Sequence, residues 1–444
     1  MLKTPTDSLG ADAHAKYLDS LTRRNPLLLQ TAIKLHQSGE IPQDTWILDL
    51  DAHANNARAT VEEAKKYNLH LHYMSKQMGR NPLISQVVVS KGFDGVVAVE
   101  SQEAKSLYRY GVKISHVGHL VQIPVHEIDY TLSMRPDAWT VLSYDNARVL
   151  SERAEKMGVK QDLLVQVIGK DDMFYEQEVG GFNYDTVTED VKKINSLPNV
   201  QVVGTTTMPA LLYDLKSNKV KTTNNLKTIV SAANRLSDEL GIDIKQINAP
   251  GHTQVSTMRL IAEAGATHGE PGTGISGAGT WQVYEDQVEI PAMTYVTEVS
   301  HIYGDTVYLQ GGGTAYALGG YGVSPDGSFW MGPLDCQLDF LIGRTYESAL
   351  INKLHSTYKG PDPMNYTHYF PHQGKKISTG DTALTGFCSP QVWVTRSWVA
   401  VVQGIQENKP KLLGIFDQAN NLIDKHGHLL GEKPVLDLVK KFSD

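Results

Sequence analysis

Residues 69–76 have the sequence LHLHYMSK, an apolar strand-like run that ends in a lysine. Runs of four to eight mostly apolar residues, bounded by glycine or polar residues, indicate buried strands. Similar runs recur along the chain and alternate with helix-like segments such as 52–67 and 101–110. The strand-like runs lie at 45–50, 69–75, 95–99, 114–121, 139–142, 163–167, 200–204, 244–248 and 266–268.

This alternation predicts an α/β fold. About eight strands in roughly 230 residues is the size of a (β/α)8 barrel of the TIM type. An open doubly wound sheet is the structural alternative, but no GxGxxG motif follows the first strand. We therefore predict a (β/α)8 TIM-type barrel.

The chain on either side of the barrel has a different pattern. Residues 8–39 carry apolar side chains at helical spacing, which predicts a short N-terminal helical segment. From about residue 290, short strand-like runs alternate with glycine-rich turns such as 311–313, which is typical of an antiparallel β domain. The predicted domains are a helical segment at 1–40, the barrel at 41–290 and a C-terminal β-rich domain at 291–444.

Composition excludes several classes of partner. The 444 residues carry a formal net charge of −8, which argues against nucleic acid and anionic membranes as partners. No apolar run approaches the length of a membrane span. The two cysteines cannot build a disulfide framework and show no zinc-site spacing, so we expect a cytoplasmic protein without a metal site.

Lys76 is the first candidate for chemistry. Side chains alternate along a strand, so His72, Met74 and Lys76 share one face. If that face is the barrel interior, Lys76 lies at the C-terminal mouth, where barrel active sites are found. From position alone a solvated lysine is the commoner outcome, and we expect His72 to be a packed interior residue.

Two turns near the end of the barrel favour an anion. Residues 247–256 (INAPGHTQVS) run from a strand into a helix, and residues 269–277 (GEPGTGISG) form a glycine loop after the next strand. Small and hydroxyl residues at such turns present N–H donors to a phosphate. A single glycine loop is more often a linker. A lysine amine in a partly dry site can form a Schiff base, so Lys76 and the two turns together predict a pyridoxal phosphate site.

Three further motifs carry a family resemblance: DLD at 49–51, SKQMGRNP at 75–82 and GHLVQIP at 118–124. Through them the chain resembles the alanine-racemase-like (fold-type III) pyridoxal phosphate enzymes, and within that family the YhfX-type proteins. The resemblance implies that Lys76 is the Schiff-base lysine. It also implies a head-to-tail homodimer in which each site is completed by the partner's β domain. The residues that it assigns to the phosphate are Gly251, His252, Thr253, Ser256, Gly272, Thr273 and Gly274.

Two positions depart from the alanine racemase pattern. The loop before the phosphate glycine carries Glu270, where alanine racemases have an arginine that faces the pyridine nitrogen. A glutamate at this place resembles the basic-amino-acid decarboxylases instead. Residues 204–209 read GTTTMP, which places Met208 where the family has a histidine stacked on the cofactor ring. A thioether can pack on an aromatic ring.

The second acid/base group has two candidates. Tyr316 lies in GTAY at 313–316, at a distance from the phosphate loop comparable to that of the alanine racemase tyrosine. Cys336 lies in GPLDCQLD at 332–339, which has the decarboxylase letters with Asp and Cys exchanged. For both, a turn tyrosine or a buried thiol is an equally good interpretation. His119 and Gln122 are candidates to contact the cofactor's ring oxygen or the substrate, and interior packing explains His119 equally well.

These features predict an amino-acid racemase or epimerase that uses pyridoxal 5'-phosphate and acts on a small-molecule amino acid. Inversion needs two bases that flank a planar carbanion, one of them Lys76 and the other from the second subunit. A decarboxylase or a D-hydroxy-amino-acid aldolase on the same fold is the alternative that Glu270 favours. A cofactor-carrying regulatory protein is the non-enzymatic alternative, and the long segment after the barrel counts against it.

Overall fold

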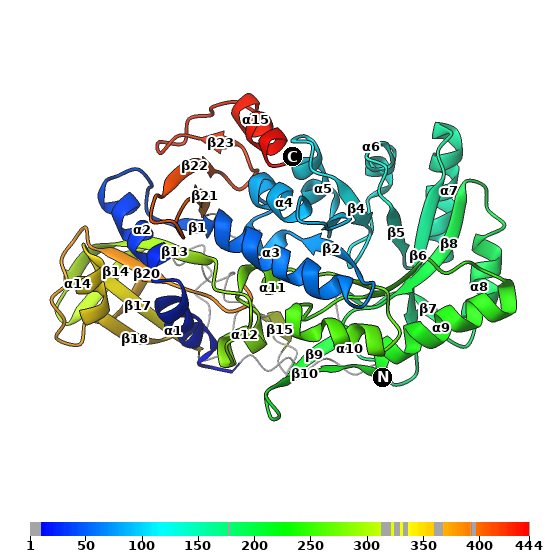
Figure 1. Ribbon diagram of the computed structural model, residues 1–444, viewed down its shortest axis with the longest axis horizontal. Helices are drawn as coiled ribbons and strands as arrows, with labels where there is room; N and C mark the ends of the chain where they lie inside the picture. Colours follow the sequence, from blue (N-terminus) through cyan, green and yellow to red (C-terminus); the bar gives the residue numbers. More distant parts are fainter. Residues whose placement is uncertain are drawn as a thin grey trace. The chain divides into compact units, whose positions relative to one another are not determined.

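The structure is a computed structural model of the 444-residue chain. It describes residues 10–175, 178–311, 321–323, 329–331, 336–358, 367–390, 392 and 397–443. The chain divides into two compact units, drawn in Figure 1. The first contains Arg58–Ser75 and Val88–Gly272, and the second contains Leu9–Ala57, Lys76–Val87 and Thr273–Asp444.

The first unit is built on a closed barrel of eight parallel strands. The short strand β7 adds to β6, and the β5–β6 pairing closes the barrel. This arrangement confirms the predicted (β/α)8 barrel. Around the barrel the strands are β2 (His70–Met74), β3 (Gly95–Ala98), β4 (Ile114–Val117), β5 (Ala138–Val141), β6 (Gln161–Ile168), β8 (Val200–Thr206), β11 (Gln246–Ala249) and β12 (His268–Gly269), and β7 is Phe182–Asn183.

Helices follow the barrel strands, as the alternating pattern predicts. In Figure 1, α7, α8 and α9 lie on the outer side of β6 and β8, against which they pack. Ser143 starts α7 by accepting a hydrogen bond from the Asn146 backbone N–H, and Gly158 ends it in the left-handed conformation. The helices of this region are α3 (Leu50–Lys65), α4 (Pro82–Val89), α5 (Ser101–Tyr108), α6 (Ile128–Ser133), α7 (Tyr144–Met157), α8 (Val187–Ile194), α9 (Asn224–Leu240) and α10 (Met258–Glu263), with a hairpin of β9 (Leu211–Asp214) and β10 (Lys219–Thr222).

The second unit holds a sheet that is almost entirely antiparallel, as predicted for the C-terminal region. Its central order is β18-β17-β20-β13-β1-β21-β22-β23, and β14 and β19 extend it from β13. Its strands are β1 (Thr45–Asp49), β13 (Met293–Tyr303), β14 (Thr306–Gln310), β17 (Cys336–Gly343), β18 (Lys353–Tyr358), β19 (Thr367–Pro371), β20 (Thr382–Thr385), β21 (Trp398–Gln403), β22 (Lys411–Phe416) and β23 (Leu422–Ile423). The remaining elements are a hairpin of β15 (Tyr321–Val323) and β16 (Phe329–Met331), and the helices α11 (Thr273–Ser276), α12 (Thr280–Tyr284), α14 (Tyr346–Ile351) and α15 (Lys433–Lys441).

The strand-like run at 45–50 forms β1, but β1 is not a barrel strand. It pairs antiparallel with β13 and parallel with β21, with Trp46 opposite Tyr295 and Val399. All five residues of β1 are buried, so the run has the same apolar character as a barrel strand. The boundaries proposed at residues 41 and 291 stay predictions.

The N-terminal segment forms α1 (Ala13–Arg24) and α2 (Pro26–Gln37), as its helical spacing predicts. Asn25 caps α2 through its Oδ1, and its Nδ2 donates to Asp49 Oδ2 at 3.1 Å. Gln406 Nε2 donates to the same carboxylate oxygen at 2.6 Å. Asp49, the first residue of the DLD motif, therefore joins the N-terminal helices, β1 and the chain after β21.

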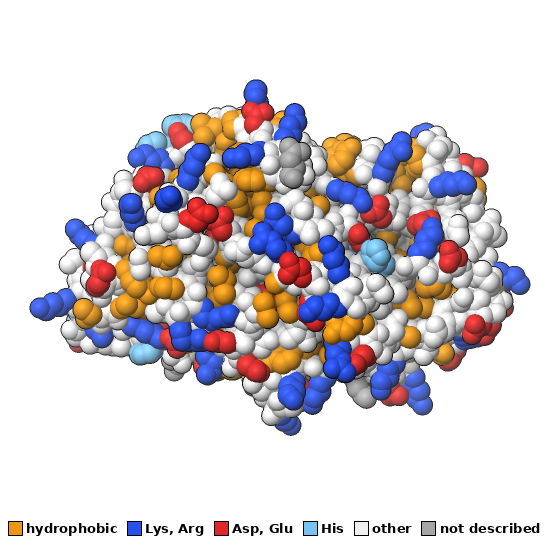
Figure 2. Space-filling view, in the orientation of Figure 1, with side chains coloured by type: hydrophobic (Ala, Val, Ile, Leu, Met, Phe, Trp, Pro, Cys, Tyr) orange, Lys and Arg blue, Asp and Glu red, His pale blue; other side chains and the backbone are white. Residues whose placement is uncertain are grey.

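Charged side chains of both signs share the visible surface (Figure 2). Figure 2 shows basic and acidic side chains interspersed over the visible face, without a large field of one sign. None of the helices in the described part of the chain is long and apolar enough to cross a membrane.

Candidate active site

The C-terminal ends of β2 and β12 lie side by side in the barrel. His70 is opposite His268 in the parallel register, and the Met74 N–H donates to the Pro271 carbonyl oxygen at 3.0 Å. β2 ends at Met74, and Lys76 begins a short 3-10 helix, η1 (Lys76–Met78), two residues further on. The predicted lysine therefore follows the C-terminal end of a barrel strand, as expected, although it is not itself in the strand. Its role in holding a cofactor stays a prediction.

Glu270 follows β12 and is buried in the barrel, with a side chain that is 1% exposed. Its Oε1 accepts a hydrogen bond from His116 Nδ1 at 2.9 Å and another from Asn248 Nδ2 at 2.8 Å. His119 Nε2 lies 3.3 Å from its Oε2. Among the described residues, none makes a hydrogen bond to Oε2. The carboxylate is thus held by hydrogen bonds at Oε1, and its Oε2 faces His119 Nε2.

The surroundings of Glu270 keep it ionised. Burial alone would raise the pKa of its carboxyl group, because the charged form loses hydration. The charge of His119 and the hydrogen bond from His116 outweigh burial and lower the pKa to about 2. Glu270 therefore remains a carboxylate over the whole physiological pH range and is suited to face a cationic N–H group.

The chain turns sharply after β4, which brings His119 into the cluster. Gly118 has φ +75°, and a Cβ there would lie 2.5 Å from the Thr140 carbonyl oxygen, so only glycine fits. Gln122 Nε2 donates to the carbonyl oxygens of Gly118 and Thr140 at 2.8 and 3.1 Å. His119 is completely buried, whereas the Gln122 amide ties the turn to β5. The predicted contacts of His119 and Gln122 with a cofactor or substrate stay predictions.

Below Glu270, the barrel interior contains a column of imidazoles. His72 stacks on His268 with ring centroids 5.4 Å apart and lies 5.7 Å from His116. His72 Nδ1 pairs with Ser115 Oγ at 2.7 Å, and His72 Nε2 pairs with Gln246 Nε2 at 3.2 Å. Because the Gln246 amide nitrogen can only donate, His72 Nε2 is an acceptor and the ring is neutral. The expectation that His72 is a packed interior residue is confirmed.

These histidines predict a pH dependence of stability. Burial is the main cause that lowers the pKa of His72 from 6.5 to about 3 and that of His268 to about 2. Below pH 6.5, the ordinary pKa of histidine, these two side chains bind protons in the unfolded chain but not in the folded barrel. Each histidine therefore contributes its full stabilisation above pH 6.5, and loses it as the pH falls toward 3.

We expect His72→Gln to flatten the acid side of the stability profile. The slope of the free energy of unfolding between about pH 6 and 5 should fall by about 1.4 kcal/mol per pH unit relative to the unsubstituted protein. Urea titrations at several pH values measure this slope, and exposed His428→Gln is the control for loss of an imidazole. A His72→Gln slope equal to that of the unsubstituted protein would contradict the assignment of His72 as a buried neutral ring.

The turn after β11 is fixed by a glycine in an unusual conformation and by hydrogen bonds within the loop. Gly251 has φ +102°, and a Cβ there would lie 2.9 Å from the Leu211 carbonyl oxygen. Thr257 Oγ1 donates to the His252 carbonyl oxygen at 3.0 Å and accepts from the Gln254 N–H at 3.0 Å, which fixes the loop. Thr253 is buried and Ser256 is exposed. The assignment of these residues, with Gly272, Thr273 and Gly274, to a phosphate stays a prediction.

The other predicted residues have varied surroundings. Met208 follows β8, is half-buried and precedes Pro209 across a cis peptide bond. Cys336 begins β17 and is buried, at 2% exposure. Tyr316 lies outside the described residues, so the candidate second acid/base group is described only for Cys336.

Two clusters of side chains have ligand atoms close enough together to bind one metal ion. In each, the three ligand atoms lie within 4.8 Å of one another. The first is His116, His119 and Glu270, the cluster described above. The second, His70, Asp94 and His268, lies where β2 and β12 begin, and the rings of His70 and His268 stack with an angle of 18°. Near-parallel stacked rings do not direct their lone pairs at one point, which disfavours a shared ion at the second cluster.

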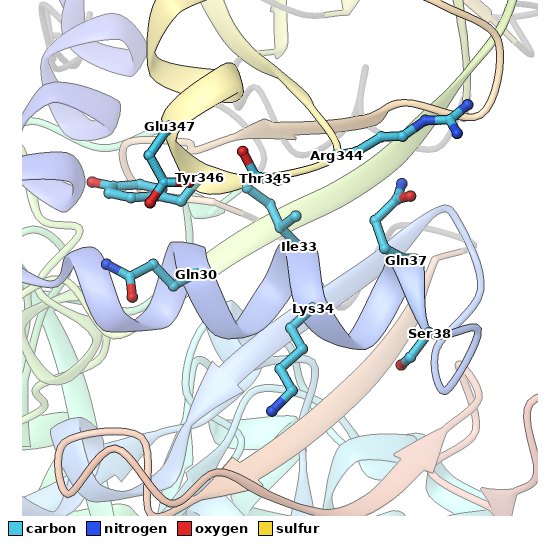
Figure 3. A pocket seen from close by; sticks show the side chains of 9 residues that line it. All are labelled: Gln30, Ile33, Lys34, Gln37, Ser38, Arg344, Thr345, Tyr346 and Glu347. Carbon is cyan, nitrogen blue, oxygen red and sulfur yellow. The ribbon is translucent and has the colours of Figure 1, made fainter.

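A groove of about 490 Å³ is found in the second unit. It lies between α2 and residues 344–347 (Figure 3), and Lys34 points away from that segment. Arg344 Nε donates to Asp381 Oδ1 at 3.0 Å, and Nη2 donates to the Thr379 carbonyl oxygen at 3.1 Å. None of the residues predicted from the sequence lines this groove.

The sequence did not single out three members of the Glu270 cluster. His116 lies in β4, Thr140 in β5 and Asn248 in β11, and His116 Nε2 pairs with Thr140 Oγ1 at 2.7 Å. The available signal was the presence of polar residues inside otherwise apolar strands. A buried strand that keeps a histidine or asparagine must pair it, because an unpaired polar group in the core is costly.

Comparison with known proteins agrees with this geometry. Residues 48–279 match the family model described as alanine racemase, N-terminal domain. The chain is 33% identical over 405 residues to a protein of Escherichia coli (strain K12) described as uncharacterized protein YhfX. That match covers 91% of this chain and 99% of the other.

Solved structures share the fold at low sequence identity. D-threonine aldolase from Filomicrobium marinum has a TM-score of 0.58 at 14% identity, covering 86% of this chain and 96% of that one. Alanine racemase of Clostridium difficile 630 has a TM-score of 0.56 at 12% identity, covering 84% and 98%. A decarboxylase and a dehydratase also share the fold, so the fold does not select one reaction. The family match and the close relative together establish that this chain belongs to the alanine racemase N-terminal domain family.

Proposed function

We propose that this protein is a pyridoxal phosphate-dependent amino-acid racemase or epimerase. The observation that carries the proposal is the buried Glu270 carboxylate at the C-terminal end of β12. It is ionised, held through Oε1, and has no hydrogen bond to Oε2 from the described residues. Asn248 Oδ1 is a second buried acceptor without a hydrogen bond among them. A ligand with a ring N–H fits such acceptors, and the family supplies that ligand in pyridoxal phosphate.

Each predicted residue has a definite part in this proposal. Lys76 would hold the cofactor covalently through Nζ and then accept or return the α-proton on one face of the substrate. The turn containing Gly251 and the loop after Gly272 would hold the phosphate with backbone N–H donors. Glu270 would keep a proton on the ring nitrogen. When bound, the cofactor would take up the electron pair that remains at the α-carbon after proton removal.

A decarboxylase or an aldolase of D-hydroxy amino acids is the second candidate. The favouring observation is Glu270 itself, since a carboxylate at the ring nitrogen supports strong electron withdrawal and therefore more than one bond cleavage at the α-carbon. Similarity to D-threonine aldolase and diaminopimelate decarboxylase structures supports the same alternative at the level of the fold.

One experiment separates these reactions. The cofactor-loaded protein is incubated in deuterium oxide with single L- and D-amino acids, including 3-hydroxy and basic ones. Deuterium at the α-carbon with loss of chirality supports racemisation, release of carbon dioxide supports decarboxylation, and release of an aldehyde supports carbon–carbon cleavage. Absence of all three with every amino acid, from a protein that binds the cofactor, would favour a regulatory protein instead.

We also propose a head-to-tail homodimer in which the second acid/base group comes from the partner subunit. The support is the resemblance to the alanine-racemase-like enzymes, which implies that the partner's β domain completes each site.

Complementation tests the shared site. A Lys76→Ala chain and a Tyr316→Phe chain are each expected to be inactive alone. A one-to-one mixture should recover about a quarter of the unsubstituted activity, because half of the dimers are hybrids with one intact site of two. The Lys76→Ala and Cys336→Ala mixture is the parallel test of the thiol. Recovery by neither mixture would mean that the site is not shared in this way.

A further inference from the structure

The hydrogen bonds of Glu270 define the protonation of its neighbour. Oε1 accepts from two donors, His116 Nδ1 at 2.9 Å and Asn248 Nδ2 at 2.8 Å. An ionised carboxylate can only accept, so His116 Nδ1 must carry a proton. The tautomer of His116 is therefore set by the carboxylate that it contacts.

Thr140 completes this arrangement on the other side of the ring. His116 Nε2 lies 2.7 Å from Thr140 Oγ1, and both residues are completely buried. A neutral imidazole with its proton on Nδ1 accepts at Nε2, so the Thr140 hydroxyl is the donor. With both ring nitrogens engaged, the imidazole cannot rotate without leaving a buried polar atom unpaired, which is costly.

The two carboxylate oxygens of Glu270 therefore differ in their hydrogen bonding. Oε1 already has two donors, whereas Oε2 has no hydrogen bond from the described residues and has His119 Nε2 3.3 Å away. Rotation of the carboxylate would break the bonds from His116 and Asn248. Of the two oxygens, Oε2 is therefore the one that can accept a hydrogen bond from a ligand N–H without loss of the bonds from His116 and Asn248.

We propose that His116, held by Thr140, is a positioning residue. Its hydrogen bond to Oε1 fixes the orientation of the Glu270 carboxylate, so that Oε2 can accept from the N–H of a bound aromatic heterocycle. This inference rests on the proposed function for the identity of that heterocycle, the pyridine ring of pyridoxal phosphate. The positioning itself is a property of the protein without cofactor. His116 touches neither substrate nor cofactor in this arrangement and acts only through Glu270.

The first test uses the cofactor-free protein, with nitrogen-15 labelled histidine and the His116 signals assigned by their loss in His116→Gln. We expect one protonated nitrogen, Nδ1, and one unprotonated nitrogen, Nε2, in a single tautomer. Thr140→Val removes only the hydroxyl that donates to Nε2, so it should shift the Nε2 signal to that of an acceptor without a donor while Nδ1 stays protonated, and Thr140→Ser should restore the original signal. Thr205→Val is the matched control, because its hydroxyl donates to the Ile229 carbonyl oxygen, away from this cluster.

The second test uses the loaded protein. Thr140→Val should lower the rate constant of α-proton exchange by roughly 10- to 100-fold, the range for loss of a hydrogen bond to a charged network. KM for the amino acid should stay unchanged, and Thr140→Ser and Thr205→Val should keep the unsubstituted rate.

The outcomes separate this inference from the proposed function. If His116 carries its proton on Nε2 in the unsubstituted protein, or if Thr140→Val leaves its signals unchanged, the positioning role is wrong whatever the cofactor. If the His116 signals behave as expected and the protein binds no pyridoxal phosphate, the arrangement holds and the proposed function fails. Equal loss of exchange in Thr140→Val and Thr205→Val would mean a general effect of hydroxyl removal and would overturn the inference.

Discussion

Glu270→Gln is expected to lower the rate of α-proton exchange by roughly 100- to 1000-fold, the scale for removal of one preorganised electrostatic partner. The amide has no negative charge, so it cannot hold a proton on the cofactor's ring nitrogen. Cofactor binding should persist, because the turn at Gly251 and the loop after Gly272 are untouched. Exchange of the substrate α-hydrogen with deuterium oxide measures the rate, and cofactor absorption measures binding.

Two variants make the result specific. Asp172→Asn removes another fully buried carboxylate of the barrel unit, one that accepts from the Gly169 N–H and from Asn224 and Thr228. It should keep full exchange. Glu270→Asp retains the charge but shortens the side chain, so it should give an intermediate rate.

The pH dependence is a further check on Glu270. Its pKa is lowered to about 2, so its protonation does not change between about pH 5 and 9. Between pH 5 and 9, no change in the rate of exchange should therefore be due to titration of Glu270. The pH profiles of the unsubstituted protein and of Glu270→Gln should have the same shape in this range. Unchanged exchange together with an unchanged cofactor spectrum in Glu270→Gln would remove Glu270 from the mechanism.

The barrel could be predicted because its strands are short, apolar and separated by helical segments. The run at 69–75 became β2, and the runs at 139–142 and 200–204 became β5 and β8. The run at 45–50 shows the limit of this reasoning. It is as buried as a barrel strand, yet its partners are Trp398–Val402 and Met293–Val296. Burial is a local property that the sequence reveals, whereas pairing is set by contacts far along the chain.

The candidate site likewise contains residues that could be predicted from the sequence and residues that could not. Glu270 could be predicted because a family resemblance fixes its place in one short loop. Its partners could not, because His116, Thr140 and Asn248 come from three different strands and meet only when the barrel closes. His72 is intermediate: alternation of side chains along β2 placed it inside, but its pairing with Ser115 and Gln246 is visible only in the structure.

The polar interior also explains how Glu270 can be buried as a carboxylate. A carboxylate buried alone would take up a proton, since burial raises its pKa. In this barrel the two nearby imidazoles and the Asn248 amide offset that cost. The same neighbours require neutral histidines beneath them, and the low pKa values of His72 and His268 meet that requirement. The expected acid sensitivity of folding and the low pKa of Glu270 thus rest on one arrangement of residues.

Lys76→Ala is expected to abolish covalent attachment of pyridoxal phosphate and to lower α-proton exchange by roughly 100- to 10,000-fold, the range for loss of a general acid–base group. The reason is that an alanine provides neither an amine for the cofactor's aldehyde nor a base for the α-proton. Borohydride treatment followed by peptide mass spectrometry locates the attachment. In the unsubstituted protein the modified peptide should be the one that contains Lys76.

Lys76→Arg is the sharper variant, because it keeps the positive charge and most of the length while removing the nucleophilic amine. It should bind the cofactor without a covalent bond, and borohydride should leave the chain unmodified. Lys91→Ala, a half-buried lysine at the end of α4, should retain both attachment and exchange. The Lys76 and Glu270 substitutions therefore test two separate assignments. Attachment that persists at the same level in Lys76→Ala would place the cofactor on another lysine and would refute the assignment.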